Sequence, residues 1–378
     1  SEPLFEYNVC KLPNVRTISR IMPQTLVEAD LHKLISQFLR AEKPMIVVGQ
    51  MRPTTIDTTL IKELEKHAVV ISEVLSGVGT LQNADELLAT STETVELKPD
   101  FILYLGGHLI GKNIKSLLRQ AQDAAQWLIN EGGEVIDTFM HLTTIVETLP
   151  NNVLSLMVQM MQQIDKKQHE AHVNAYIQRW QKAHNDYREH LKKERLEYTE
   201  AFAVQCFEQQ LSHSTTPYEV HYANSMSVRL ANKYARHPVW CNRGVNGIEG
   251  SLSTAAGMSL TTTNNVYCII GDLSFFYDQN ALWNTRLKGN FRIILLNNGG
   301  GKIFQHVKGM PANDIRDTFV SAEHRTSAQG ICQQNGVKYL VANNKKELQK
   351  GVTELINHNE DCPIVLEVNF KQSAGATA

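Results

Sequence analysis

Apolar runs alternate with amphipathic stretches along the first 150 residues. Residues 27–43 carry apolar side chains at helical spacing, and a short apolar run follows at once. Strands separated by helices of this length indicate βαβ units and a parallel sheet. Residues 1–26 contain three prolines and are expected to be an irregular lead-in. The expected strands of this half are 44–50, 68–74, 100–107 and 125–130, with helices near 55–67, 84–91 and 112–122.

The pattern changes after residue 150. Residues 152–198 contain no Gly or Pro and become increasingly charged, which predicts one or two long connecting helices. A second α/β alternation follows, so we predict two three-layer αβα domains with parallel sheets: a central domain with its helical connector at 1–190, and a second domain at 191–378. The expected strands of the second domain are 218–224, 264–272, 291–298 and 363–370, with helices at 198–212, 227–235, 251–260, 278–289 and 345–356.

The composition argues against a nucleic-acid-binding, membrane-spanning or secreted protein. Lys plus Arg total 37 and Asp plus Glu total 39, so the net charge is −2. That balance gives no electrostatic reason to bind nucleic acid or an anionic membrane. No apolar run approaches the length of a membrane span, and the N-terminus has no signal-peptide pattern. The six cysteines form no C-x-x-C pair or zinc pattern, which favours buried thiols in the cytoplasm.

Two turns in the second domain carry the strongest chemical signal. Gly271-Asp272 ends one apolar strand, and Asn297-Asn298 ends the next, followed by three glycines at 299–301. The intervening helix makes a βαβ unit, so both turns are expected at the carboxyl edge of the sheet, where ligands bind. Carboxylate, amide and carbonyl oxygens suit Mg²⁺, and glycines let the backbone approach a diphosphate. Either turn alone would more simply be an ordinary strand-to-helix turn.

These paired turns resemble the diphosphate and Mg²⁺ motif of thiamine diphosphate enzymes. The likeness extends further, to the family of 2-succinyl-5-enolpyruvyl-6-hydroxy-3-cyclohexene-1-carboxylate synthases (MenD), abbreviated here to SEPHCHC synthases. It spans essentially the whole chain and is densest in the second half. The stretches that carry it are 2–5, 105–112, 223–229, 242–257, 271–283 and 297–304.

The resemblance implies a role for individual residues. Asp272 and Asn298 would bind Mg²⁺ (or Mn²⁺) through their side chains, and Gly300 through its carbonyl. Ile248 would press between the two rings of thiamine diphosphate, and Ser274 would contact a phosphate. The other cofactor-binding positions are Gly271, Asn297 and Gly299; the substrate-binding positions are Lys112, Ser225, Arg229 and Arg243 for carboxylates and Ile303 and Phe304 for the apolar side.

The implied reaction is decarboxylation of 2-oxoglutarate and addition of the succinyl-semialdehyde unit to isochorismate, in menaquinone biosynthesis. Both substrates are anionic, and arginine suits carboxylates. The family has three domains, and this chain resembles the middle and last of them. The activating glutamate is expected from the first domain, so no catalytic residue is assigned here and the chain alone is expected to be nearly inactive. The family also implies a homodimer or homotetramer.

Two other classes of function stay open from the sequence. Gly106 to Lys112 fits the phosphate-binding spacing G-x-x-x-x-G-K between a strand and a helix, although Asn113 replaces the usual Ser or Thr. This alternative is a nucleotide-binding module. The other is a non-catalytic homologue that binds no Mg²⁺-dependent ligand. Arg229 alone would more simply be a solvated surface residue.

Overall fold

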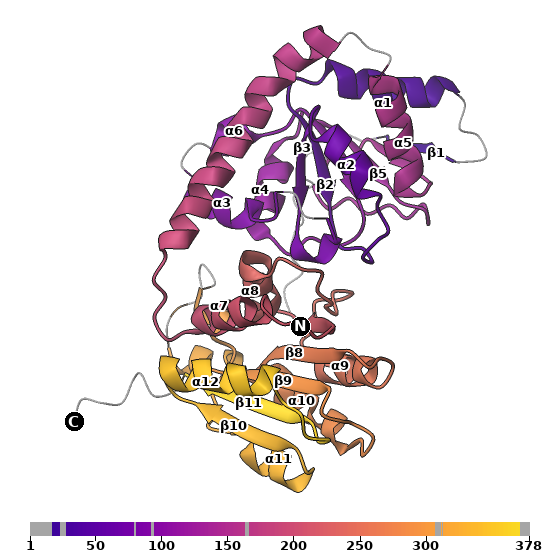
Figure 1. The fold of residues 1–378 in the computed structure, drawn as a ribbon. Helices are drawn as coiled ribbons and strands as arrows, with labels where there is room; N and C mark the ends of the chain where they lie inside the picture. The colour runs from indigo at the N-terminus through magenta and orange to yellow at the C-terminus, as the bar shows by residue number, and fades with distance from the viewer. Residues whose placement is uncertain are drawn as a thin grey trace, which may run out of the picture.

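A computed structural model describes residues 17–22, 28–78, 81–91, 94–162, 166–306, 311 and 313–370. The segment 2–5 of the family resemblance lies outside these residues. The described chain forms two parallel sheets, of six and five strands, with helices packed on them (Figure 1). This confirms the predicted α/β fold class.

The first sheet has the strand order β1-β6-β5-β4-β2-β3, and every neighbouring pair is parallel. Its central strands are buried on both faces, which explains their continuous apolar runs. The expectation that residues 1–26 are irregular is wrong for β1, which pairs with β6 at the edge of the sheet. Each of these two strands has three residues, too few to show the alternation of apolar and polar side chains that marks a strand. The strands are β1 (Ser19–Ile21), β2 (Pro44–Val48), β3 (Val69–Ser72), β4 (Phe101–Leu105), β5 (Ala125–Ile129) and β6 (Thr144–Val146).

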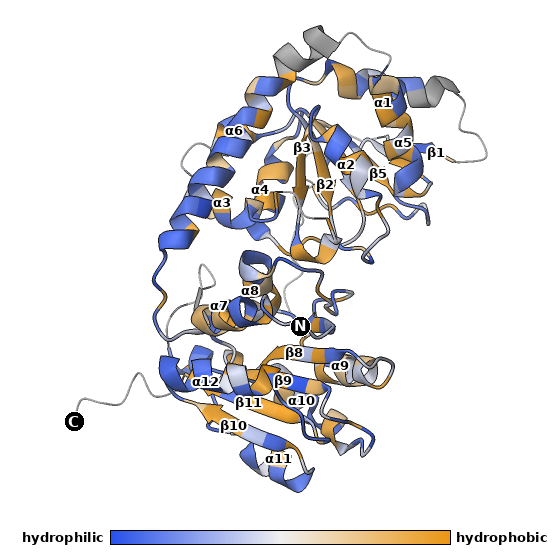
Figure 2. Ribbon diagram, viewed as in Figure 1, coloured by the Kyte–Doolittle hydropathy of each residue, from blue (hydrophilic) through white to orange (hydrophobic). Residues whose placement is uncertain are grey.

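The predicted connector is two helices, α5 and α6, and α6 packs on the first sheet. Trp180 of α6 is fully buried, and the Tyr176 hydroxyl and Trp180 indole donate to the Leu97 carbonyl at 3.0 and 3.3 Å. The outer side of α6 is hydrophilic (Figure 2). The helices of this half are α1 (Glu28–Arg40), α2 (Thr58–Leu64), α3 (Ala84–Thr90), α4 (Lys112–Gln120), α5 (Pro150–Met161) and α6 (Lys166–Lys193).

The second sheet has the order β10-β11-β9-β8-β7, again all parallel. Edge strand β10 was not predicted, because its side chains are mostly half-buried and form no apolar run. The strands are β7 (Tyr218–Tyr222), β8 (Asn265–Gly271), β9 (Phe291–Asn297), β10 (Lys338–Ala342) and β11 (Ile364–Asn369). The helices are α7 (Glu200–Leu211), α8 (Met226–Tyr234), α9 (Ser251–Ser259), α10 (Asp272–Tyr277), α11 (Gln329–Gln334) and α12 (Lys345–Ile356).

One helix lies earlier than predicted. In place of a helix at 278–289, α10 begins directly at Asp272 and is followed by the 3₁₀ turn η4 (Gln279–Trp283). Asp278 lies between the two with a non-helical backbone (φ −122°, ψ 16°), and its carboxylate accepts from the Ser253 N–H of α9 at 2.7 Å. Asp272, a candidate metal ligand, is therefore both the first residue after β8 and the first residue of α10.

The first and second halves of the chain are joined by hydrogen bonds and by apolar packing. The Val74 N–H donates to Asn232 Oδ1 at 3.0 Å, and the Gln50 amide donates to the Cys241 carbonyl at 3.2 Å. Val74 and Leu75 join the apolar core of the second half. Residues that follow β2 and β3 of the first half therefore help to shape the surface around α8. The domain boundary at 190/191 stays a prediction.

Within the part of the chain that the structure describes, no helix is both long and apolar enough to cross a bilayer.

Candidate functional site

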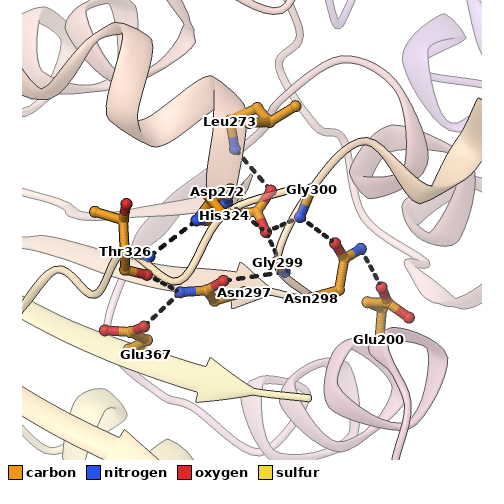
Figure 3. Close-up of polar contacts among 10 residues, drawn as sticks. All are labelled: Glu200, Asp272, Leu273, Asn297, Asn298, Gly299, Gly300, His324, Thr326 and Glu367. Atoms are coloured by element: carbon orange, nitrogen blue, oxygen red, sulfur yellow. Dashed lines mark hydrogen bonds and ion pairs between the residues drawn. The ribbon is translucent and has the colours of Figure 1, made fainter. Parts of the chain in front are cut away.

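The two predicted turns meet at the carboxyl edge of the second sheet. Strands β8 and β9 are parallel neighbours, with Gly271 opposite Leu296, so the residues that follow them emerge side by side. Asp272 Oδ2 accepts hydrogen bonds from the N–H groups of Gly299 and Gly300 at 2.7 and 3.0 Å (Figure 3). This confirms the predicted proximity of the turns.

The Asp272 carboxylate is buried, with 3% of the residue exposed, and N–H groups surround it. Its Oδ1 accepts from the Leu273 N–H at 2.7 Å, and His324 Nε2 lies 3.3 Å from Oδ2. His324 Nδ1 accepts from the Thr326 N–H at 3.1 Å, so the proton of a neutral ring is on Nε2, facing Asp272. The backbone N–H groups of Leu273, Gly299 and Gly300 compensate the burial of the charge and hold the carboxylate at the strand end.

Asn297 is fully buried and holds the second turn in place. Its amide Nδ2 donates to Glu367 Oε1 at 2.6 Å and to the Thr326 carbonyl at 2.9 Å, and its Oδ1 accepts from Gly299 at 3.2 Å. The whole side chain is therefore engaged within the protein, and its predicted contact with the cofactor would have to come from the backbone.

Asn298 shares a donor with Asp272. Asn298 Oδ1 accepts from the Gly300 N–H at 3.1 Å, the same group that donates to Asp272, while Nδ2 donates to Glu200 Oε1 at 2.7 Å. Gly299 and Gly300 have φ values of +86° and +152°, where side chains are disfavoured. Glycine is thus required for the turn that brings Asp272 Oδ2 and Asn298 Oδ1 to the same N–H group, that of Gly300.

This donor set fits Mg²⁺ and a diphosphate. A carboxylate, an amide oxygen and the Gly300 carbonyl are hard oxygen ligands of the kind Mg²⁺ takes. Among the residues that the structure describes, no three His, Cys, Asp or Glu side chains form a group that could hold a metal ion. A Cβ at Gly271 would meet nothing within 4 Å, so the backbone before Asp272 faces open space where a phosphate could approach.

The segment 242–250 is organised by a buried asparagine. The Asn224 amide donates to the carbonyls of Asn242 and Gly247, the latter at 2.6 Å, and its Oδ1 accepts from Arg243 Nη1 at 3.0 Å. The Ser274 hydroxyl donates to the carbonyl of Ile248. Ile248, half-buried, is thereby tied to the start of α10. Since Ser274 already donates its proton to Ile248, its phosphate contact stays a prediction.

Basic side chains from both halves gather on one loop. Arg243 is 6% exposed and its Nη2 donates to the Leu109 carbonyl at 3.2 Å, which the Lys115 ammonium also reaches at 3.2 Å. Arg229 Nη1 donates to the Ile110 carbonyl at 3.0 Å. Burial lowers the pKa of Arg243 and of Lys115. Arg229 is therefore half-buried and bonded rather than a freely solvated arginine.

The remaining predicted substrate residues lie around these groups. Lys112 is exposed at the first position of α4, while Lys115, which the sequence did not single out, reaches the loop instead. Ser225 has φ +76° and ψ −125° ahead of α8, a strained conformation of the sort found at functional sites. Ile303 is half-buried and Phe304 is 39% exposed, directly after the glycine turn.

The loop that resembles a phosphate-binding motif has three of its N–H groups occupied by the protein. The N–H groups of Ile110 and Gly111 both donate to the buried Glu73 carboxylate, the second at 2.7 Å, and Gly107 donates to the Gln50 carbonyl at 2.8 Å. A phosphate-binding loop needs those N–H groups for its ligand. The geometry therefore does not fit a nucleotide phosphate at Gly106 to Lys112.

Glu73 gives a testable pH dependence. Burial raises its pKa from 4.5 to about 7. The folded state therefore binds this proton more tightly, so the free energy of unfolding falls as pH rises from about 4.5 to about 7 and levels above. Glu73→Gln removes this titration and should lessen the slope in urea unfolding at pH 5, 6, 7 and 8, while Glu86, whose pKa burial also raises to about 7, keeps part of it. Exposed Glu42→Gln should keep the original slope; an unchanged slope in Glu73→Gln would contradict the assignment.

Several residues of the site carried no local signal. The side chains that position the candidate site come from distant parts of the chain. Neither their spacing nor their residue type identifies them in the sequence as site residues. Only Asn224 lies in a stretch that the family resemblance covers. These residues are Glu73, Lys115, Glu200, Asn224, His324 and Glu367.

Comparison with known proteins identifies the class. Residues 22–224 match the family described as the middle domain of thiamine pyrophosphate enzymes, and residues 223–368 match the C-terminal thiamine pyrophosphate-binding domain. The chain therefore belongs to the thiamine diphosphate enzyme family, as its middle and C-terminal domains.

Within that family the chain is similar to proteins named SEPHCHC synthase. It is 33% identical over 379 residues to the one from Bacteroides thetaiotaomicron and 34% identical over 384 residues to the one from Bacteroides fragilis. The one from Phocaeicola vulgatus is 32% identical over 379 residues. Each match covers 97% of this chain, but 66%, 66% and 65% of the three relatives respectively. The chain thus spans slightly less than two thirds of their length.

Proposed function

We propose that this chain binds the diphosphate of thiamine diphosphate through Mg²⁺ at the carboxyl edge of its second sheet. One observation carries the proposal: Asp272 and Asn298, which directly follow the neighbouring strands β8 and β9, accept from the same Gly300 N–H. In this proposal the two side chains and the Gly300 carbonyl hold Mg²⁺ or Mn²⁺. Gly271 and Gly299 let the backbone approach the phosphates, and Ile248, tied to Ser274, supports the rings.

We further propose that the whole enzyme joins 2-oxoglutarate and isochorismate, as the names of its relatives indicate. The cofactor, when bound, supplies the electron sink for decarboxylation. The chain's own contribution is to bind and orient two anions and to exclude water. Arg243 and Arg229 are suited to the carboxylates, since each is held by a carbonyl of the 109–110 loop and keeps further N–H groups to donate. Ile303 and Phe304 would cover the apolar side.

The assembly and location are part of the same proposal. A homodimer or homotetramer follows from the family resemblance, and the exposed Tyr277 and Trp283 on α10 and η4 offer apolar surface that a second copy could cover. A cytoplasmic location is supported by the described cysteines, all of which are free. The activating glutamate remains an expectation from the family resemblance.

Arg243→Met tests the substrate assignment. With thiamine diphosphate and Mg²⁺ present, this variant should bind 2-oxoglutarate or isochorismate about 10–100-fold more weakly than the unaltered chain, because a charged hydrogen bond contributes about 1.5–3 kcal/mol. Binding is measured by calorimetry. Exposed Arg286→Met is the matched control and should bind normally. Equal binding by both variants would remove Arg243 from the substrate site.

The nucleotide-binding alternative predicts a different result. It requires ATP binding that depends on Lys112 and is indifferent to Asp272. The occupied N–H groups at Ile110 and Gly111 disfavour it. A non-catalytic homologue is disfavoured by the complete set of proposed Mg²⁺ ligands.

A further inference from the structure

We propose that Glu200 is a positioning residue that determines which end of the Asn298 side chain faces the cation. The inference rests on the Mg²⁺ site proposed above and adds a residue 98 positions away in the sequence. Asn298 carries an oxygen and an NH₂ group at the end of a side chain that can turn over. Only the oxygen can bind a cation, so the orientation of the amide decides whether the ligand set is complete.

The position of Glu200 is fixed by the start of a helix. Glu200 is the first residue of α7, and the side chain of the preceding Thr199 caps that helix by accepting from the Phe202 N–H. Ala203 and Phe207 bury the helix in the core of the second sheet. The half-buried Glu200 side chain therefore projects from a rigid element toward the glycine turn (Figure 3).

The chemistry of the contact allows one orientation. An ionised carboxylate only accepts hydrogen bonds, so the atom 2.7 Å from Glu200 Oε1 must be the NH₂ nitrogen of Asn298. The oxygen is then directed to the opposite side, where it accepts from the Gly300 N–H beside Asp272. A turned amide would place its NH₂ against the Gly300 N–H and leave Glu200 facing an oxygen.

The neighbouring asparagine is held in the same way. Buried Glu367 accepts from Asn297 Nδ2 at 2.6 Å, and the oxygen of that amide then accepts from Gly299. Each asparagine of the turn thus has its own carboxylate, and each oxygen is directed at a glycine N–H. The role of Glu200 is orientation rather than added negative charge, and the two roles give different results on mutation.

The test measures the Mn²⁺ concentration that half-saturates each variant in the presence of thiamine diphosphate, by water proton relaxation. Glu200→Ala should raise it about 10–100-fold, the usual loss when a residue that orients a metal ligand is removed. Glu200→Gln should raise it by less than Glu200→Ala does, because the Gln oxygen can still accept from Asn298 in one of the two orientations of its amide. Glu197→Ala is the matched control; Glu197 is 91% exposed and should be neutral.

A second background separates orientation from folding and charge. Asn298→Asp presents an oxygen whichever way it turns, so adding Glu200→Ala to this variant should not raise the half-saturating concentration. Structural damage or loss of a charge would raise it in both backgrounds. The inference is overturned if Glu200→Ala binds like the unaltered chain, if Glu200→Gln is as weak as Glu200→Ala, or if Asn298→Asp gives no rescue. Failure of the unaltered chain to bind Mn²⁺ with thiamine diphosphate would overturn the Mg²⁺ site itself, and this inference with it.

Discussion

Asp272→Ala should abolish Mg²⁺-dependent binding of thiamine diphosphate, with a Kd at least about 100-fold weaker. Losing an orienting contact to a metal ligand already costs about 10–100-fold, and here the ligand itself is removed. The variant also leaves the N–H groups of Gly299 and Gly300 without the carboxylate that they share. Calorimetric titration in Mg²⁺ measures the effect directly.

The control for this prediction is Asp361→Ala, which removes an exposed carboxylate from the same half of the chain. It should bind the cofactor like the unaltered chain. Circular dichroism and thermal unfolding establish that Asp272→Ala is still folded. Cofactor binding of normal strength by folded Asp272→Ala in Mg²⁺ would show that this sheet edge is not the diphosphate site.

Gly300→Ala should lower the free energy of unfolding of the second domain by about 2–4 kcal/mol, the sum of backbone strain and overpacking. At φ +152° a side chain is disfavoured, and the new Cβ would lie 2.7 Å from the Ser321 carbonyl oxygen. Since that oxygen belongs to the backbone, it cannot move aside cheaply. The shifted turn should also separate Asp272 from Asn298 and weaken cofactor binding.

Gly257→Ala is the opposite case and the matched control. Gly257 lies inside α9, where a Cβ would meet nothing within 4 Å. Alanine there should raise the free energy of unfolding by about 0.5–1 kcal/mol, because it favours the helix and restricts the unfolded chain. Thermal unfolding of both variants checks the pair. Destabilisation of equal size in both would contradict the special geometry of Gly300.

The second sheet shows what local sequence can and cannot predict. Strands β8 and β9 are apolar over most of their length, and one crossover connects them. Their order, direction and shared edge therefore follow from the pattern of apolar residues along the chain. Strands β1, β6 and β10 are not predictable in this way, because the first two are short and the third is half-exposed. The helix expected at 278–289 is misplaced, because the helical segment begins at Asp272 and is interrupted by the non-helical backbone of Asp278.

The candidate site divides in the same way. Asp272 and Asn298 are predictable because each directly follows a strand, and consecutive parallel strands end together. Glu200 and His324 are not, since they reach the site only through tertiary packing. The loop at Gly106 to Lys112 is the reverse case. Its spacing fits phosphate binding, but Glu73, distant in sequence, occupies its N–H groups.

The most direct test of the account is calorimetric titration of the unaltered chain with thiamine diphosphate in Mg²⁺ and again in EDTA, with ATP titrated in parallel. We predict saturable binding of thiamine diphosphate in Mg²⁺, none in EDTA and none of ATP. Binding of ATP without binding of thiamine diphosphate, or cofactor binding that is equally strong in EDTA, would contradict the assignment of Asp272, Asn298 and Gly300 as the ligands of a diphosphate-bound Mg²⁺.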